Sequence, residues 1–314
     1  MSELRRTMDW ISEADFEIKL IVAGNHDITL DPEFYAQHGQ GLHGDQLEDP
    51  RQCVEVITRW KPSVQLLQHQ AATIRLTRAD GPKTSFKVFG SPYSQFQGNW
   101  AFGYESSKAK ALWDSIPLDT DIIVTHTPPR SHCDQKPNGK FVGCDALRRA
   151  LNRVRPPLAI CGHVHEGRGY EIIRWQPALI RARPDADGVD GFTRGVLPST
   201  GSKKQSLVDL TDKRGPRLDN EGFSCSLPAS ASPMSPSGVS AVSGQGCAPS
   251  VSAADTHGLD QALHTLRKET CIVNAAIVAT SWPHRGGKRF HAPIVVDLEL
   301  PVWQDMAAAE SQRI

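Results

Sequence analysis

The chain has 314 residues, of which 39% are hydrophobic, enough for one sizeable α/β core or two small ones. Its 35 basic and 35 acidic residues cancel, so we expect no polyanion-binding surface and no nucleic-acid partner. No apolar run approaches the roughly 18 to 20 residues that cross a bilayer, and the polar, charged residues 1–6 lead into a helix-like stretch without the apolar core of a signal peptide. Seven scattered cysteines without a CxxC pair favour reduced thiols. We therefore expect a cytoplasmic protein with no membrane partner.

The predicted elements alternate between helix and strand. Residues 4–14 place Leu4, Met8 and Ile11 at roughly helical intervals, and the apolar run at 18–23 is typical of a strand buried on both faces. Strand-like runs follow at 84–89, 122–125 and 158–161, with helix-like segments at 54–60, 106–116 and 144–154. This alternation predicts a layered α/β fold.

The composition changes in the last third of the chain. Residues 214–257 are rich in Ser, Ala, Pro and Gly and offer few side chains that could fill a core, which predicts a disordered insertion. A helix at 259–268 and extended runs at 270–280 and 294–300 are expected after it. We therefore predict one domain, built from residues 1–213 and 258–314 and interrupted by the insertion.

Polar side chains that can bind a metal follow three of the strand-like runs directly. Loops at the carboxyl ends of strands are where α/β sheets bind ligands, and imidazole and amide groups suit divalent transition metals. The preceding glycines, Gly24 and Gly162, allow the sharp turns that would aim these side chains at one site. The candidates are Asn25, His26, Asp27, His126, His163 and His165, whereas His38, His43, His69 and His132 are interpreted as surface or core residues.

The motifs Gly24-Asn25-His26-Asp27, Thr125-His126 and Gly162-His163-Val164-His165, in this order, resemble the last three signature blocks of the calcineurin-like metallophosphoesterases. THTPP at 125–129, GCDALRRAL at 143–151 and GHVHEGRG at 162–169 resemble the branch of small metallophosphoesterase-domain proteins. The resemblance covers most of the chain outside the insertion. It implies an α/β fold with a layered β-sandwich flanked by helices.

The resemblance also implies roles for individual residues. Asn25, His126 and His163 would bind one divalent metal ion, His165 would bind a second, and His26 would be the catalytic histidine. The implied reaction is hydrolysis of a small phosphodiester or phosphomonoester by hydroxide activated between two metals. These ligand types do not distinguish manganese, iron, zinc and nickel. Asp27 would either orient His26 or cap the turn, and both interpretations stay open.

The family pattern also contains an Asp-x-His and a Gly-Asp upstream, and the second aspartate bridges both metals. This sequence reaches Gly24 without them, and the literal matches Asp255-Thr256-His257 and Gly44-Asp45 are interpreted as loop residues, because neither follows a strand-like run. We therefore expect the N-terminal strand of the fold to be missing, with a loss of stability, and one weakly bound metal ion rather than two.

Three functions stay open at this point. The first is a metal-dependent phosphoesterase, which is either active or inactive in this truncated form. The second is a non-catalytic scaffold or binding protein derived from a phosphoesterase. The third, ranked last, is a hydrolase with a single metal ion held by His126, His163 and His165.

Overall fold

A computed structural model describes residues 1–95, 98–177, 188–199, 202–204, 206–213, 217–220, 266–279 and 287–302. Its α-helices are α1 (Ser2–Glu13), α2 (Pro32–His43), α3 (Pro50–Thr58), α4 (Ala109–Asp114) and α5 (Asp145–Val154). Short 3-10 turns are η1 (Ile28–Leu30), η2 (Ser106–Lys108) and η3 (His165–Gly167). The strands are β1 (Lys19–Ile21), β2 (Val64–Leu66), β3 (Gln70–Arg75), β4 (Ser85–Ser91), β5 (Ser94–Gln95), β6 (Gly103–Tyr104), β7 (Ile122–Thr125), β8 (Leu158–Cys161), β9 (Gly169–Trp175), β10 (Val189–Gly195), β11 (Ser206–Asp209), β12 (Glu269–Asn274) and β13 (Ile294–Asp297).

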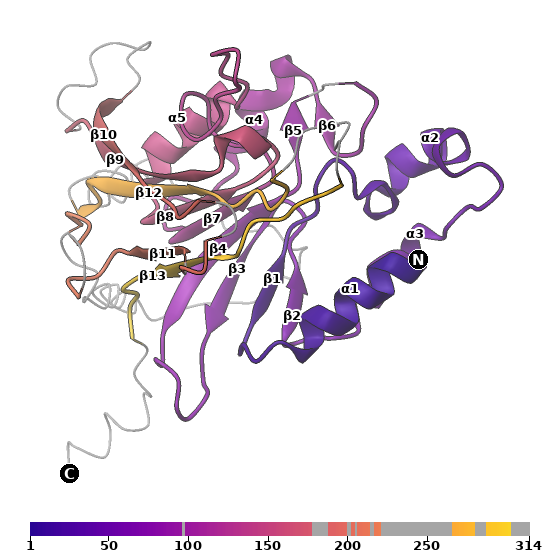
Figure 1. Ribbon diagram of the computed structural model, residues 1–314, viewed down its shortest axis with the longest axis horizontal. Coiled ribbons are helices and arrows are strands. Elements are labelled where there is room, and N and C mark those ends of the chain that lie inside the picture. The colour runs from indigo at the N-terminus through magenta and orange to yellow at the C-terminus, as the bar shows by residue number, and fades with distance from the viewer. Residues whose placement is uncertain are drawn as a thin grey trace, which may run out of the picture.

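The centre of the molecule is a mixed sheet of seven strands in the order β10-β9-β12-β8-β7-β4-β3. The strands β4, β7, β8 and β12 run parallel, and the flanking strands β3, β9 and β10 are antiparallel to their neighbours. Helices α4 and α5 cover one face of this sheet, and the parallel pair β11 and β13 lies on the other (Figure 1). The predicted layered α/β class is confirmed. The carboxyl ends of the four parallel strands meet at one edge.

An apolar layer lies on each face of the central sheet. On the helical face, Trp113 of α4 and Leu147 of α5 are fully buried with Ile123 and Ile272 of the sheet. On the other face, Val208 of β11 packs in a cluster with residues of β8 and β12. The helix α5 forms because Leu147, Leu151 and Val154 recur at helical spacing, while the Cys144 sulfur accepts a hydrogen bond from the Leu147 N–H at its start.

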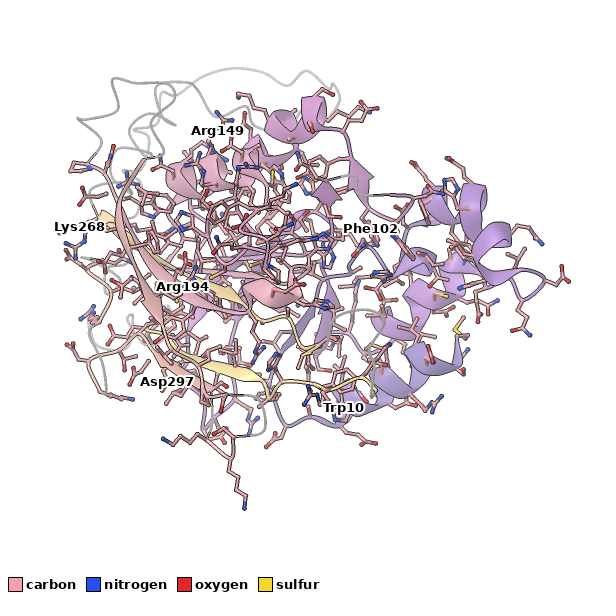
Figure 2. The ribbon with its side chains drawn as sticks, turned by 45° about the horizontal axis from the view of Figure 1, so that its top comes forward. Trp10, Phe102, Arg149, Arg194, Lys268 and Asp297 are labelled. Carbon is pink, nitrogen blue, oxygen red and sulfur yellow. The ribbon has the colours of Figure 1, made fainter. Side chains whose placement is uncertain are left out.

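A second cluster lies beside the sheet, where α1, α2 and α3 pack with β1 and β2. Met8, Val56 and Val64 form its buried centre. Phe102 belongs to the same cluster and lies at the junction between the helices and the sheet (Figure 2).

The first strand differs from its prediction. Instead of being buried on both faces, β1 is only half-buried, spans three residues and pairs in parallel with β2 alone, outside the seven-stranded sheet. The helix α2 was not predicted, because only Tyr35 and Gly39 of it are buried and the apolar spacing is correspondingly weak. Its start is nonetheless marked in the sequence, since the Asp31 carboxylate accepts from the Phe34 N–H and Pro32 occupies the first turn.

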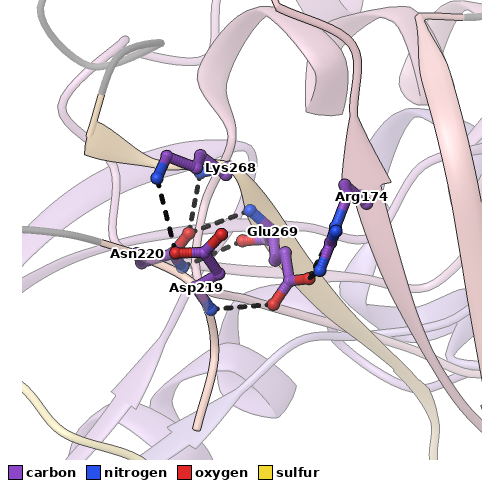
Figure 3. Close-up of polar contacts among 5 residues, drawn as sticks. All are labelled: Arg174, Asp219, Asn220, Lys268 and Glu269. Atoms are coloured by element: carbon purple, nitrogen blue, oxygen red, sulfur yellow. Dashed lines mark hydrogen bonds and ion pairs between the residues drawn. The ribbon is translucent and has the colours of Figure 1, made fainter.

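Residues 217–220 are fixed against the start of β12 (Figure 3). The Asn220 side chain accepts hydrogen bonds from the N–H groups of Lys268 and Glu269, at 2.8 and 2.9 Å, and donates to the Glu269 carbonyl at 3.0 Å. The Glu269 carboxylate accepts from the Asp219 N–H at 2.8 Å and forms an ion pair with Arg174 of β9. Two segments that are distant in sequence therefore meet here.

The predicted division of the chain stays a prediction. Residues 214–216 and 221–265 lie outside the described ranges, so most of the insertion predicted at 214–257 and most of the helix expected at 259–268 fall there. Residues 217–220, which the prediction placed in the disordered insertion, are instead held against β12. Within the described ranges, no helix is long and apolar enough to cross a membrane. The cysteines in those ranges, Cys53, Cys133, Cys144, Cys161 and Cys271, are buried and form no disulfide with one another.

Candidate metal centre

Three of the predicted ligands meet at one point near the edge of the sheet. His126 Nε2 lies 2.7 Å from Asn25 Oδ1 and 3.0 Å from His163 Nδ1. The two imidazole rings are 4.6 Å apart between centroids and meet edge to face. We call Asn25, His126 and His163 the donor cluster. Its residues come from three loops that are far apart in the sequence, as the sequence predicts.

The carboxyl ends of the parallel strands position His126. It follows β7, its N–H donates to the Ser91 carbonyl at the end of β4 at 3.0 Å, and its own carbonyl accepts from the Gly162 N–H at 3.1 Å. Gly24 passes directly against the ring, so that a Cβ atom there would lie 2.6 Å from His126 Cε1. Only glycine lets the Asn25 loop approach the imidazole this closely.

The loop of His163 is both strained and firmly held. His163 has a φ of 63°, in the left-handed region that residues with a Cβ adopt at a cost of about 1–2 kcal/mol. The fully buried Asn274, at the end of β12, donates hydrogen bonds of 2.8 Å to the carbonyls of Val164 and Cys133. A strained residue that its surroundings hold in place is a common feature of functional sites.

Burial keeps the two imidazoles of the donor cluster neutral. Burial, together with the nearby His163, lowers the pKa of His126 to about 3. Burial, followed by the charge of Lys136, lowers the pKa of His163 to about 4. Neutral imidazole is the form that binds a metal, so both side chains are ready to act as ligands near neutral pH.

His26 and Asp27 are neighbours in the same loop and make different contacts. His26 is exposed, and its ring lies 4.2 Å from the ring of Trp100 between centroids. The Asp27 carboxylate accepts a hydrogen bond of 2.6 Å from the Gly24 N–H. Of the two interpretations left open for Asp27, the contact observed is the one that stabilises the turn.

His165 does not form a three-ligand group with His126 and His163. It begins the short turn η3, is exposed, and lines a pocket whose walls include no residue of the donor cluster. Among the described residues, no three His, Cys, Asp or Glu side chains gather in a group that could hold a metal ion. The donor cluster, with one amide oxygen and two neutral imidazole nitrogens, therefore fits a single divalent transition metal. The described residues do not assemble the carboxylate-bearing ligand set that a pair of ions would need.

Two residues of the site were not singled out as site residues from the sequence. Trp100 follows no strand-like run, so only its contact with the His26 ring reveals it. Asn274 carried a usable signal, because it is a polar residue directly after an apolar strand, like the predicted ligands. His132 is a core residue, as predicted: it is 4% exposed and lies 2.9 Å from the Glu171 carboxylate.

Comparisons with known proteins identify a family and several relatives of this chain. The family model of the calcineurin-like phosphoesterases matches residues 5–167. Metallophosphoesterase domain-containing protein 1 of Homo sapiens and its counterpart in Mus musculus are each 31% identical to this chain over 175 residues, covering 54% of the chain and 51% of the relative. A protein of Emericella nidulans named "Probable rhamnogalacturonate lyase C" is 35% identical over 175 residues, covering 55% of the chain and 15% of that protein.

Because the family model matches just over half of the chain, the chain belongs to the calcineurin-like phosphoesterase family. It spans about half the length of the two mammalian relatives. The lyase name describes the fungal protein, of which this chain matches a small part. One solved structure aligns at a TM-score of 0.35 and 19% identity, covering 54% of this chain and 58% of that one.

Proposed function

We propose that this protein is a metal-dependent phosphoesterase that hydrolyses a small phosphodiester or phosphomonoester. The observation that carries the proposal is the donor cluster, in which Asn25 Oδ1 and His163 Nδ1 lie 2.7 and 3.0 Å from His126 Nε2. These neutral side chains come from three separate loops and are the ligand types that divalent transition metals accept. Membership of a phosphoesterase family adds to this argument.

The residues of the site have different proposed roles in this reaction. When bound, a divalent ion supplies positive charge to the phosphoryl group and favours the ionised form of water. Asn25, His126 and His163 would hold the ion, and Gly24 lets the Asn25 loop lie against the His126 ring. His26 is exposed at the same loop and protonates the leaving oxygen. Trp100 limits the motion of the His26 ring by lying against it.

A second candidate is a non-catalytic scaffold or binding protein that keeps the phosphoesterase fold. One observation favours it: among the described residues, no carboxylate joins the donor cluster to form a three-ligand His, Cys, Asp or Glu site. A pair of dications held close together without an anionic ligand would be electrostatically costly. The two candidates therefore differ in whether bound metal leads to turnover.

Metal content and turnover, measured on the same preparations, separate the two functions. The chain is incubated with manganese, dialysed, and analysed for metal by mass spectrometry, and hydrolysis of bis(4-nitrophenyl) phosphate is followed in the same buffer. The variants are His126→Ala, which breaks the donor cluster, and His26→Ala, which leaves it intact. His38→Ala is the control, because His38 contacts Phe34 and Asn99 instead.

We expect one metal ion per chain and slow turnover in the parent and in His38→Ala. We expect neither in His126→Ala, and metal without turnover in His26→Ala. Metal without turnover in the parent would favour the scaffold. Turnover that survives His126→Ala would rule out the donor cluster as its source.

A further inference from the structure

A pocket of about 710 Å³ lies beside His165, one of the predicted site residues. Its walls come from η3, from the start of β9 and from the end of β10. Gly195 gives the pocket part of its shape, because a Cβ there would lie 1.8 Å from the ring of Tyr170. Tyr170 thus forms an aromatic wall of the pocket, and His165, another lining residue, is two residues after His163 in the sequence. This pocket is not needed to explain hydrolysis, which raises the question of its ligand.

Arg168 gives the pocket a cation without a carboxylate partner. Two of its N–H groups donate to the carbonyls of Ala276 at 3.0 Å and Ala292 at 2.6 Å. No acidic side chain in the described ranges pairs with it, and its remaining N–H groups make no other contact there. A guanidinium that is half-buried and balanced only by neutral carbonyls attracts an anion.

Arg194 adds a second guanidinium, which is held rigidly. Both its Nε and Nη2 atoms donate to one oxygen of Glu171, at 3.0 and 2.6 Å, while His132 lies 2.9 Å from the other oxygen. Glu171 is fully buried, but the Arg194 side chain is 59% exposed. The buried carboxylate therefore orients a guanidinium whose outer side faces the pocket. Glu166, the exposed carboxylate of the lining, forms no ion pair with either arginine.

We propose that this pocket binds a second oxyanion group, carried by the organic part of the phosphate ester, and that Arg168 is the residue that selects for it. The proposal rests on the proposed function, since it assigns the substrate class of the same site. The substrate would be a phosphate ester that also bears a carboxylate or another phosphate. Arg168 supplies the uncompensated charge, and Arg194 supplies a fixed donor face.

Binding of three small probes to metal-free protein tests this directly. The probes are glycerol 3-phosphate, 3-phosphoglycerate, which adds a carboxylate, and 2,3-bisphosphoglycerate, which adds a further phosphate. Metal is removed on a chelating resin, because a soluble polycarboxylate chelator would compete for the pocket. Affinities are measured by titration calorimetry at constant ionic strength. For the parent chain, we expect both multiply charged probes to bind at least about tenfold more tightly than glycerol 3-phosphate.

Arg168→Gln should abolish this preference, and Arg168→Lys should keep most of it. Arg149→Gln is the control, because Arg149 is exposed on α5 and pairs with Asp145 outside the pocket. Ser199→Glu serves as an independent variant, in case Arg168→Gln fails to fold. It adds a negative charge to an exposed wall residue and should weaken the preference.

Equal affinities in the parent chain, or a preference that survives Arg168→Gln, would overturn the proposal. The difference between the two multiply charged probes shows whether carboxylate or phosphate is preferred. Turnover with manganese is measured separately. A lost binding preference with turnover intact contradicts this inference alone, whereas intact preference without turnover contradicts only the proposed hydrolysis.

Discussion

Asn220 and Glu269 are 49 residues apart in sequence and share two hydrogen bonds, so that the asparagine side chain continues the backbone pairing of β12 (Figure 3). The strand β12 is buried along its whole length. Its far end is Asn274, which holds the loop of His163. The contact between Asn220 and Glu269 therefore stabilises one end of β12, and Asn274 at its other end positions the loop of His163.

Asn220→Ala should destabilise the fold by about 2–4 kcal/mol, because it removes the partners of the Lys268 and Glu269 N–H groups and the Glu269 carbonyl. Asp219→Ala is the matched control. Its side chain is 51% exposed and reaches Lys268 at 3.4 Å, so we expect less than about 1 kcal/mol. Urea denaturation measures both, and equal losses would contradict the special role of Asn220.

Most of the central sheet could be predicted from the sequence, because β4, β7, β8 and β12 are short apolar runs with no competing pattern. The pairing of β1 could not be predicted, since a six-residue apolar run reads as a strand wherever its partner lies. The antiparallel strands β9 and β10 were missed for a different reason. The outer faces of β10 are largely exposed, so its sequence lacks the apolar signal that a buried strand carries.

Gly24→Ala should weaken metal binding and stability together. The added Cβ would lie 2.6 Å from His126 Cε1, so either the loop of Asn25 or the imidazole must move, at a cost of about 1–3 kcal/mol. Gly41→Ala is the opposite case, because no atom lies within 4 Å of its added Cβ and Gly41 is on the exposed face of α2. It should stabilise by up to about 1 kcal/mol.

Thermal unfolding and metal content check this pair of glycine variants. The proposed close approach would be wrong if Gly24→Ala bound metal as well as the parent does. A loss of stability in Gly41→Ala would instead show that other atoms crowd the added Cβ on α2.

His163→Gly should be more stable than His163→Ala by about 1 kcal/mol. Both variants remove the imidazole, but alanine keeps the Cβ that is disfavoured at a φ of 63°, whereas glycine adopts this conformation readily. Neither should bind metal. Denaturant midpoints of the two variants, compared at equal slopes, measure the difference. Greater stability of the alanine variant would mean that the backbone at this position is relaxed.

The donor cluster was within reach of sequence reasoning, and the rest of the site was not. Asn25, His126 and His163 each follow an apolar run, so their convergence was expected from the carboxyl ends of strands. The position of His165 depends on the conformation of η3 after Val164, and the spacing of residues in the sequence does not predict that conformation. The pocket beside His165 is lined in part by the end of β10, a strand without an apolar pattern in the sequence.

The pH dependence of stability should carry a signature of the donor cluster. Burial lowers the pKa of His126 to about 3 and that of His163 to about 4, whereas an unfolded histidine titrates near about 6.5. Between about pH 4 and 6.5 the unfolded chain therefore binds more protons than the folded chain. Stability rises with pH in this window, and this contribution is lost as the pH falls.

Buried carboxylates act in the opposite sense and must be separated from this effect. Burial raises the pKa of Asp121 and Asp134, so the folded chain binds more protons than the unfolded chain just above their usual range. His163→Gln leaves these groups in place and removes one titrating imidazole. Subtracting the two stability curves in metal-free buffer therefore gives the contribution of His163 together with its effect on the pKa of His126. We expect the variant to show a slope shallower by up to about one proton between pH 4 and 6.5. Parallel curves would show that His163 is protonated in the folded state as readily as in the unfolded one, and the imidazole would then not be held neutral for a metal.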